Sequence, residues 1–482
     1  MTSSRSCLLL SCALALAACA VGPDYKRPTV DSPPAFKEAP EGWKPAEPQD
    51  TRARPNWWEV FGDSDLDALV ERVAGANQTL ATSLANYNQA VALARQARAG
   101  YYPTVTANVS SNRASLPTTN AVSSGTPVTV NEVSLSADWE PDLWGRVRRT
   151  VESEDASVAA SRADLESTRL SLQAQAVQDY FQLRIADAQR KLLDEAVQAY
   201  TKSLELTRNR YTQGVVTRAD VVQAQAQLAA AQAQWVDVDI SRAQLEHAIA
   251  VLIGVAPSAL TLEPKPDLAP AMTLPAVPGA VPSQLLERRP DIAGAERRVA
   301  AANAQIGVAT SAWFPVLDLN GTYGRRSTTW VGLLNAPTNL WSVGASLAET
   351  IFDGGARSAS IDAARSSHDA SVATYRQTVL SAFQEVEDNL AALRVLANEA
   401  DYQREAVRAA RESLDLTVNQ YKAGTVSYLN VITAQTTLLS NQQNELNLRS
   451  RQLVATAVLI RALGGGWQAV AVIGAGPTIA GR

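Results

Sequence analysis

The chain has 482 residues and a net charge of −5, with 46% hydrophobic and 19% charged residues. This composition indicates a folded protein, and its mildly acidic balance offers no basic surface for nucleic acid, so no nucleic-acid partner is predicted. The chain has only two histidines and no phosphate-binding loop, zinc-ligand spacing or nucleophile elbow. The sequence therefore predicts no enzyme, no catalytic or metal-binding residue and no cofactor.

Residues 1–18 have the pattern of a bacterial lipoprotein signal peptide. Arg5 precedes an apolar run that is too short to span a bilayer, and small residues lead into Cys19. We predict cleavage before Cys19, acylation of Cys19 and a lipidated, extended segment over residues 19–65. The alternative is an ordinary secretory signal that happens to end near a cysteine. Because Ala20 rather than aspartate follows the cysteine, resemblance to lipoproteins favours sorting to the outer membrane.

Two segments far apart in the chain repeat one phrase: residues 211–225 read YTQGVVTRADVVQAQ and residues 421–435 read YKAGTVSYLNVITAQ. Residues 146–213 and 356–423 contain neither glycine nor proline, and a single glycine, Gly214 or Gly424, ends each stretch. The sequence therefore predicts two repeats, over 66–254 and 286–463. A proline-rich connector over 255–285 joins them, and a tail over 464–482 follows.

Each repeat is predicted to contain a helix, two strands, a very long helix, a glycine turn and a further helix. The strands are expected at about 103–113 and 128–141 in the first repeat, and at about 315–325 and 340–351 in the second. Apolar residues alternate with polar ones in all four, and each strand has the length that crosses a membrane.

The helices after the glycine turns carry seven-residue periodicity, which is typical of coiled coils. The apolar positions of the second copy are Ile432, Leu439, Leu446, Leu453 and Ile460, and those of the first copy are Val222, Ala229, Val236, Ala243 and Ala250.

Four strands cannot close a sheet in lipid, because the open edges would leave backbone groups without hydrogen-bond partners. Three copies would supply twelve strands. We therefore predict a mainly α-helical protein with a membrane β-part: a trimeric 12-stranded β-barrel, four strands per chain, continued by a long α-helical coiled-coil barrel, with an internal duplication.

The sequence resembles the TolC-type outer-membrane efflux factors, and most of all the NodT-type efflux lipoproteins. The resemblance rests on the repeat phrases, on the order of several short motifs, and on their extent over nearly the whole mature chain. These motifs are Leu16-Ala17-Ala18-Cys19, Gly22-Pro23-Asp24-Tyr25, Trp57-Trp58 with Phe61-Gly62-Asp63, and Arg289-Pro290-Asp291-Ile292.

The resemblance implies a passive exit duct in the outer membrane of a bacterial cell, with its helical part in the periplasm. It implies a homotrimer that contacts outer-membrane lipids, a periplasmic adaptor protein and an inner-membrane pump of the resistance-nodulation-division type. The cargo would be drugs or other small toxic molecules, and the pump would supply the energy.

The two glycine turns are the expected docking sites for the adaptor, by the same resemblance. The alternative is that they are simply tight turns between helices. The residues concerned are Gln213, Gly214, Val215, Ala423, Gly424 and Thr425.

A gate beside these turns is the second expected site. Many relatives have acidic residues just after the second turn, where this chain has Asn430 and Thr433. The first copy has Asp220, which three subunits would bring together in a ring of charge, with Arg218 as its neutralising partner. The alternative is an aspartate that the helix dipole favours.

Two other functions remain open at this point. One is the outer-membrane duct of a type I polypeptide secretion system, and the other is a trimeric coiled-coil envelope lipoprotein that transports nothing. The alternating strands and the alanine-rich seams favour a hollow duct over the second alternative, and the lipoprotein signal favours efflux over the first.

Overall fold

The computed structural model describes residues 20–31, 33–38, 56–115, 127–275, 288–335 and 338–465. The predicted signal peptide and Cys19 lie outside these ranges, as do parts of the predicted extended segment, connector and tail. Contacts group the chain into two units. The strand-containing unit includes Asn86–Arg162 and Gly294–Tyr375, and the helical unit includes Ala163–Ala293 and Arg376–Arg482. Each predicted repeat contributes to both units, so the contacts divide the chain differently from the repeats.

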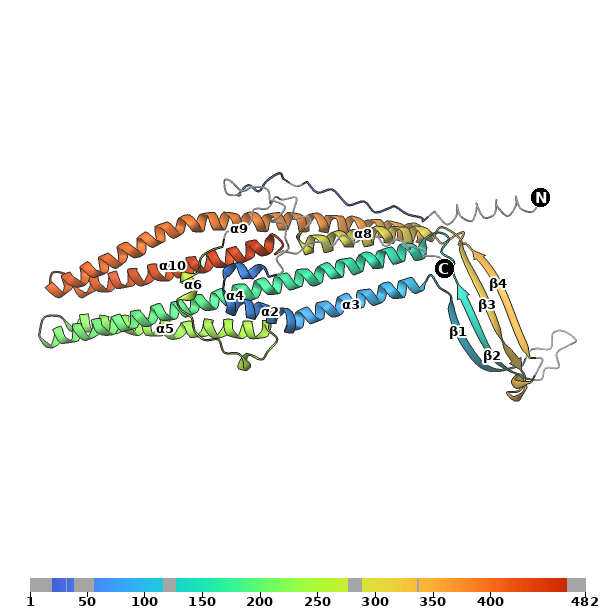
Figure 1. Ribbon diagram of the computed structural model, residues 1–482, viewed down its shortest axis with the longest axis horizontal. Helices are drawn as coiled ribbons and strands as arrows, with labels where there is room; N and C mark the ends of the chain where they lie inside the picture. Colours follow the sequence, from blue (N-terminus) through green and yellow to red (C-terminus); the bar gives the residue numbers. More distant parts are fainter. Residues whose placement is uncertain are drawn as a thin grey trace. The chain divides into compact units, whose positions relative to one another are not determined.

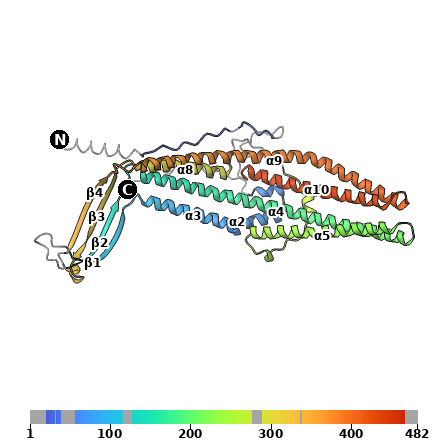
Figure 2. The ribbon, with the colours of Figure 1, turned by 180° about the vertical axis from the view of Figure 1, so that it is seen from behind.

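Two very long helices, α4 (Arg146–Thr212) and α9 (Ala356–Ala423), dominate the structure (Figure 1). Each is followed by a 35-residue helix, α5 (Arg218–Leu252) or α10 (Tyr428–Ala462), which runs back beside it (Figure 2). Helices α4 and α9 begin and end within a residue of the predicted stretches without glycine or proline. Both residues are unfavourable inside helices, so their absence sets the helix length.

A four-stranded antiparallel sheet has the strand order β1-β2-β3-β4. The strands are β1 (Thr104–Ala114), β2 (Val128–Trp139), β3 (Val316–Ser327) and β4 (Asn339–Ala348). They lie at the four predicted positions, with ends shifted by at most three residues. Helix α3 (Gln78–Ala99) precedes β1, and α8 (Pro290–Ser311) precedes β3. Both halves of the chain therefore repeat the predicted element order.

The prediction of an extended segment up to residue 65 is wrong at its end. Residues Trp57–Phe61 form the 3-10 helix η1, and α2 (Ser64–Ala76) begins directly afterwards. Trp57 and Trp58 are each only 3% exposed and pack into the core of the helical unit beside α4, α5 and α10. Burial of two indole rings outweighs the extended tendency of the proline-rich sequence before them.

The connector contains the short helices η2 (Pro257–Ala259) and α6 (Leu268–Ala271). A buried ionic cluster holds the residues between them. Asp187 of α4 accepts from the Lys265 backbone N–H at 2.9 Å and from the guanidinium of Arg242 at 2.8 Å. Arg184 donates to the Glu263 carbonyl at 2.8 Å. Because charged groups cannot be buried without partners, this cluster fixes the connector on α4 and α5.

Within the residues that the structure describes, no helix combines the length and the apolar character needed to cross a membrane.

Candidate functional site

The sheet has one apolar and one polar face. The strand register places Ala107, Leu135, Tyr323 and Trp341 in one row, and the next row toward the helices contains Val105, Ala137, Gly321 and Val343. A third row contains Trp139, Leu319 and Ala345. The large side chains of the first two rows are exposed, so none of the other described residues covers them.

The opposite face carries hydroxyls, amides and charges. Its rows include Thr106, Ser136, Thr322 and Ser342. The hydroxyls of Ser136 and Thr322 lie 3.3 Å apart, and Arg326 donates to Glu132 at 2.7 Å across β2 and β3. An antiparallel sheet of this kind separates an apolar environment on one side from water on the other.

The turns between the paired helices share one backbone motif. The Gly214 N–H donates to the Tyr211 carbonyl at 2.9 Å, and the Val215 N–H donates to the Arg210 carbonyl at 2.9 Å. In the second copy Gly424 donates to Tyr421, and Thr425 to Gln420, each at 3.0 Å. This is the Schellman pattern, in which the residue after the helix takes a left-handed conformation. Gly214 has φ +72° and Gly424 has φ +81°, values that only glycine adopts without strain.

All six residues that the sequence singled out for docking lie at these two turns and are exposed. Thr425 also donates its hydroxyl to the Gln420 carbonyl at 3.0 Å. An added Cβ at Gly214 would meet nothing within 4 Å. The turns therefore present backbone and the exposed side chains of Gln213, Val215 and Thr425 to the outside.

Arg210 links the two helix pairs, a contact that the sequence reading missed. Its guanidinium donates to the Tyr421 carbonyl at 2.7 Å and to the Lys422 carbonyl at 3.3 Å, and it stacks on the Tyr421 ring with 4.6 Å to the centroid. These are last-turn carbonyls of α9, which an arginine both caps and neutralises. The sequence shows only a basic residue near the end of α4. It does not reveal the contact, because residues 211 positions apart share no periodic pattern.

Apolar side chains and tyrosine and threonine hydroxyls pack together next to the contact between Arg210 and Tyr421. The Tyr421 and Tyr428 rings lie 5.4 Å apart, beside the buried Leu204 and Val431. The Thr207 and Tyr421 hydroxyls are 3.5 Å apart. Burial raises the pKa of Tyr428, so its hydroxyl stays neutral at physiological pH.

Asp220 forms a capping box at the start of α5. Its carboxylate accepts from the Thr217 N–H at 2.9 Å and from the Thr217 hydroxyl at 2.8 Å, and the Thr217 hydroxyl accepts from the Asp220 N–H. These hydrogen bonds give Asp220 a local partner in Thr217 within the chain. In α10 the corresponding N-cap, Ser427, makes no side-chain cap.

The other predicted gate residues also lie near the starts of these helices. Asn430 and Thr433 are exposed, and the Thr433 hydroxyl donates to the Leu429 carbonyl at 3.0 Å. Arg218 is exposed at the first position of α5.

The residues after Cys19 are held at the point where β2 leads into α4. The Val21 N–H donates to the Trp144 carbonyl at 3.0 Å. Arg149 is almost fully buried and donates to the Val21 and Gly22 carbonyls and to Asp24. An added Cβ at Gly22 would lie 2.4 Å from the Gly307 Cα, so residues 20–24, here called the strap, cross α8 in contact with its backbone.

Two apolar stripes on the helices are left exposed by the residues that the structure describes. On α5, Val222, Val236 and Ile240 are 52–58% exposed, although Val222 and Val236 belong to the predicted seam. On α9, Val395, Tyr402 and Leu416 are exposed. Val222, Ala229 and Val236 of the predicted first-copy seam are therefore exposed, although Ala250 at its far end is buried; Leu439 and Leu453 of the second copy are buried.

An amphipathic membrane-type sheet and duplicated helix pairs within one chain are features of the class of outer-membrane efflux proteins. Residues 69–255 and 281–465 match the outer membrane efflux protein family, and the chain belongs to this family. The predicted mainly helical, duplicated fold with four strands is confirmed, and so is an efflux function in the bacterial outer membrane.

Individual proteins are similar along nearly the whole chain. The probable efflux pump outer membrane protein TtgC of Pseudomonas putida is 32% identical over 474 residues, covering 97% of this chain and 96% of the relative. The solvent efflux pump outer membrane protein SrpC of Pseudomonas putida is 32% identical over 460 residues, covering 94% and 97%. The solved outer-membrane channel OprN has a TM-score of 0.85 at 31% identity and covers 94% of this chain and 100% of that one.

Proposed function

We propose that the chain is one of three identical subunits of a passive exit duct, which carries small toxic molecules out of the cell for an energised inner-membrane pump. The observation that carries this proposal is the sheet, which is apolar on one face and polar on the other, and whose edge strands β1 and β4 have no further strand partner among the described residues. Such edges are satisfied when copies join edge to edge and enclose the polar face.

The exposed helix stripes support the same assembly. Val222, Val236 and Ile240 of α5 offer the side chains that a neighbouring copy's α9 would cover with Val395, Tyr402 and Leu416. Val236→Asp would place a charge in that interface and should reduce the trimer, whereas the exposed Ala230→Asp on the same helix should not. Native mass spectrometry in detergent measures the subunit number, and a stable single chain for the wild-type protein would refute the duct.

The cargo follows from chemistry and from the relatives. A hollow polar passage without a catalytic step selects weakly, and the relatives are named for antibiotics, toluene and solvents. We propose small, partly apolar toxic compounds as the cargo. A strain that lacks the gene and every redundant duct should become sensitive to some members of a panel of such compounds. Unchanged tolerance to the whole panel would contradict efflux.

The glycine turns are proposed as the docking surface for a periplasmic adaptor. Support comes from the shared backbone motif, which presents two equivalent exposed surfaces at Gly214 and Gly424. A photo-crosslinking residue at Val215 or Thr425 should capture the adaptor, whereas one at the exposed Ala230 of α5 should not. Equal capture at all three positions would contradict docking at the turns.

Asp220 is proposed to add negative charge at the periplasmic constriction of the trimer. Its capping role has to be separated from its charge. Asp220→Asn keeps an oxygen that accepts from Thr217, whereas Asp220→Ala loses the cap as well. If the charge acts on ions, the asparagine variant loses cation preference in planar bilayers. If only the cap matters, asparagine behaves as wild type and alanine alone destabilises the turn.

Cys19 is proposed as the lipid attachment site. The strap of residues after it is seated beside Trp144 and Arg149, where the membrane sheet begins, so an acyl chain on Cys19 would start at the inner margin of the membrane. Mass spectrometry of the mature N-terminus tests this, with Cys19→Ala as the control. An unmodified wild-type N-terminus would refute acylation.

A further inference from the structure

The two repeats correspond residue by residue around the sheet. Pro103 before β1 corresponds to Pro315 before β3, 212 positions later, and Gly145 before α4 corresponds to Gly355 before α9, 210 positions later. Gly145 and Gly355 also share a left-handed backbone, with φ +81° and +93°. One offset therefore aligns β1 and α3 with β3 and α8, and the other aligns β2 and α4 with β4 and α9.

The two offsets reproduce the observed strand register. The β1–β2 ladder begins with Thr104 opposite Asp138, and the offsets transfer this pair to Val316 and Ala348. Val316 does pair with Ala348 in the β3–β4 ladder. Because the correspondence holds to the residue, a contact seen at one place in the duplicated structure predicts the equivalent contact at another.

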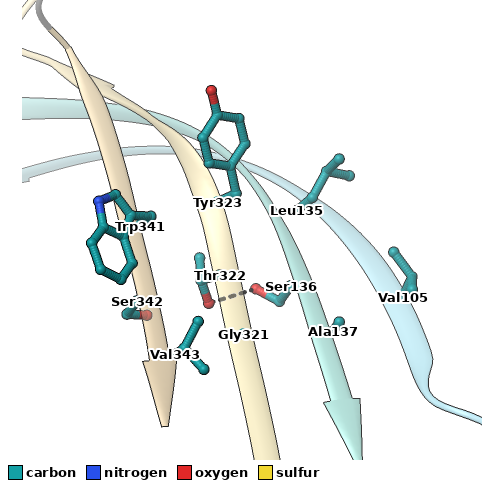
Figure 3. A pocket seen from close by; sticks show the side chains of 10 residues that line it. All are labelled: Val105, Leu135, Ser136, Ala137, Gly321, Thr322, Tyr323, Trp341, Ser342 and Val343. Atoms are coloured by element: carbon teal, nitrogen blue, oxygen red, sulfur yellow. Dashed lines mark hydrogen bonds between the residues drawn. The ribbon is translucent and has the colours of Figure 1, made fainter.

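The central ladder is where the two repeats meet inside the chain. Here β2 and α4 contact β3 and α8, an arrangement that we call the repeat junction. Figure 3 shows one of its contacts, in which the Ser136 and Thr322 hydroxyls lie 3.3 Å apart on neighbouring strands. The sheet order leaves β4 and β1 as edges. In the proposed trimer, on which this inference rests, β4 of one copy meets β1 of the next, at what we call the subunit junction.

The offsets give the register of the subunit junction. Ser136 corresponds to Ser346 of β4, and Thr322 corresponds to Ser110 of β1. Both positions keep a hydroxyl, so the polar side of the sheet would again carry a hydroxyl pair, now between strands of different copies. Cross-strand hydroxyl pairs of this kind stabilise a sheet.

The same register joins exposed apolar residues on the other face. Leu347 would lie opposite Val109 of the next copy, and each is 67% exposed in the single chain. A slip of one residue would turn the apolar side chains of one strand onto the polar face, so the alternation of both strands excludes it.

An aromatic contact follows at the helix end of the strands. At the repeat junction the Trp144 ring stacks on Phe314 with 5.0 Å between centroids, and its indole N–H donates to the Pro315 carbonyl at 2.7 Å. Phe314 corresponds to Tyr102, which is 72% exposed, and the loop before α9 offers Phe352, which is 88% exposed. Phe352 is therefore expected to pack on Tyr102 of the next copy.

Helix α3 is bare where its counterpart α8 is covered. Three residues of α8 are at most 9% exposed, namely Ala300, Ala304 and Ser311. Their counterparts in α3 are all exposed, namely Asn88, Ala92 and Ala99. An exposed face on α3 is what the subunit junction requires, because the neighbour's α9 would cover it.

The side chains on that face differ in polarity between the two junctions. At the repeat junction the Ser153 hydroxyl of α4 donates to the Ala301 carbonyl at 3.1 Å and accepts from the Gln305 amide at 2.9 Å. The counterpart of Gln305 is Leu93 of α3, and that of Ser153 is Ala363 of α9, both exposed. The equivalent contact between copies is therefore apolar.

We propose that α3 and β1 of each copy receive α9 and β4 of its neighbour in the geometry of the repeat junction. Leu93 then packs on Ala363, Ser110 faces Ser346, and Tyr102 seats Phe352. The polar helix contact inside the chain and the apolar one between chains keep the two junctions from being exchanged during assembly, because each surface disfavours the other's partner.

Disulfide trapping of the full-length protein in outer membranes measures the register. Ser346→Cys is combined with Ser110→Cys, or with Asn108→Cys or Asn112→Cys as matched controls. The control positions lie on the same face, about 7 Å along the strand, where a disulfide cannot form without backbone movement. After oxidation, non-reducing electrophoresis should show joined chains at least several-fold more with Ser110→Cys than with either control. Preferential joining through a control, or no preference among the three, overturns the register.

A pair of substitutions tests the helix contact independently. Leu93→Gln should lower the temperature at which the trimer dissociates in detergent. Adding Ala363→Ser rebuilds the hydroxyl–amide contact of Ser153 and Gln305, so it should raise the midpoint again toward the wild-type value. Ala363→Ser should not rescue Val236→Asp on α5, which is the control. Equal midpoints with and without Ala363→Ser in the Leu93→Gln background would contradict the contact.

Native mass spectrometry of the wild-type protein separates this inference from the proposed function. A trimeric wild type for which both tests fail refutes the proposed junction and leaves the duct intact. A wild type that stays a single chain refutes the duct itself, and the subunit junction with it.

Discussion

Replacing Arg210 by alanine should release the end of α9 without unfolding the rest of the helical unit. The guanidinium makes two hydrogen bonds to last-turn carbonyls and stacks on Tyr421. In a half-exposed setting, the hydrogen bonds contribute about 1 kcal/mol, the ring contact about 0.5 kcal/mol and the charge at the helix C-terminus about 0.5 kcal/mol. The sum of about 2 kcal/mol corresponds to roughly a 30-fold increase in local opening.

Hydrogen exchange measures this opening directly. The amides of Gly424 and Thr425 donate to the Tyr421 and Gln420 carbonyls, so their exchange reports the end of α9. We expect roughly 30-fold faster exchange at these amides in Arg210→Ala. Arg210→Lys should fall between the two, because an ammonium keeps the charge but not the fork. Arg208→Ala, at an exposed position on the same helix, is the control. Unchanged exchange at Gly424 and Thr425 would refute the role of Arg210 as a cap on α9.

Three other predictions concern the helical unit. Asp63 caps α2 through Oδ1 and accepts from the Tyr180 hydroxyl at 2.5 Å. Chemical denaturation of Asp63→Ala should therefore show a loss of about 2 kcal/mol of unfolding free energy. Asp63→Asn should lose much less, and an equal loss in both variants would contradict the cap. Tyr180→Phe should cost about 1 kcal/mol in the same assay, and no loss would contradict the bond to Asp63. Burial raises the pKa of Asp179, so the folded protein loses stability as pH rises from the ordinary carboxyl pKa through the raised value. Asp179→Asn should therefore be more stable than the parent at pH 7 and equally stable in acid. A thermal midpoint with the same pH dependence in both proteins would contradict this.

The long elements were predictable because their signals are local. The absence of glycine and proline sets the ends of α4 and α9, and period-two alternation locates the four strands. The capping role of Asp220 was also readable, since Thr217 precedes it by three residues in a capping-box pattern.

The remaining features depend on contacts that leave no periodic pattern. Burial of Trp57 and Trp58 requires α4, α5 and α10 to meet around them. The pairing of Arg210 with the end of α9 joins two different helix pairs. The predicted seam through Val222 and Val236 faces away from the chain, because a heptad pattern does not say whether its partner helix belongs to the same chain.

The two glycine turns have the same backbone but different first turns, with a Thr217–Asp220 box after one and an uncapped Ser427 after the other. In a ring of three chains, six landing positions would alternate between an acidic and a neutral kind, giving approximate sixfold but true threefold symmetry. A partner that reads only the shared main-chain geometry can bind with six copies, whereas one that distinguishes the carboxylate must stop at three. The stoichiometry of the assembled pump would therefore report which chemistry the partner recognises.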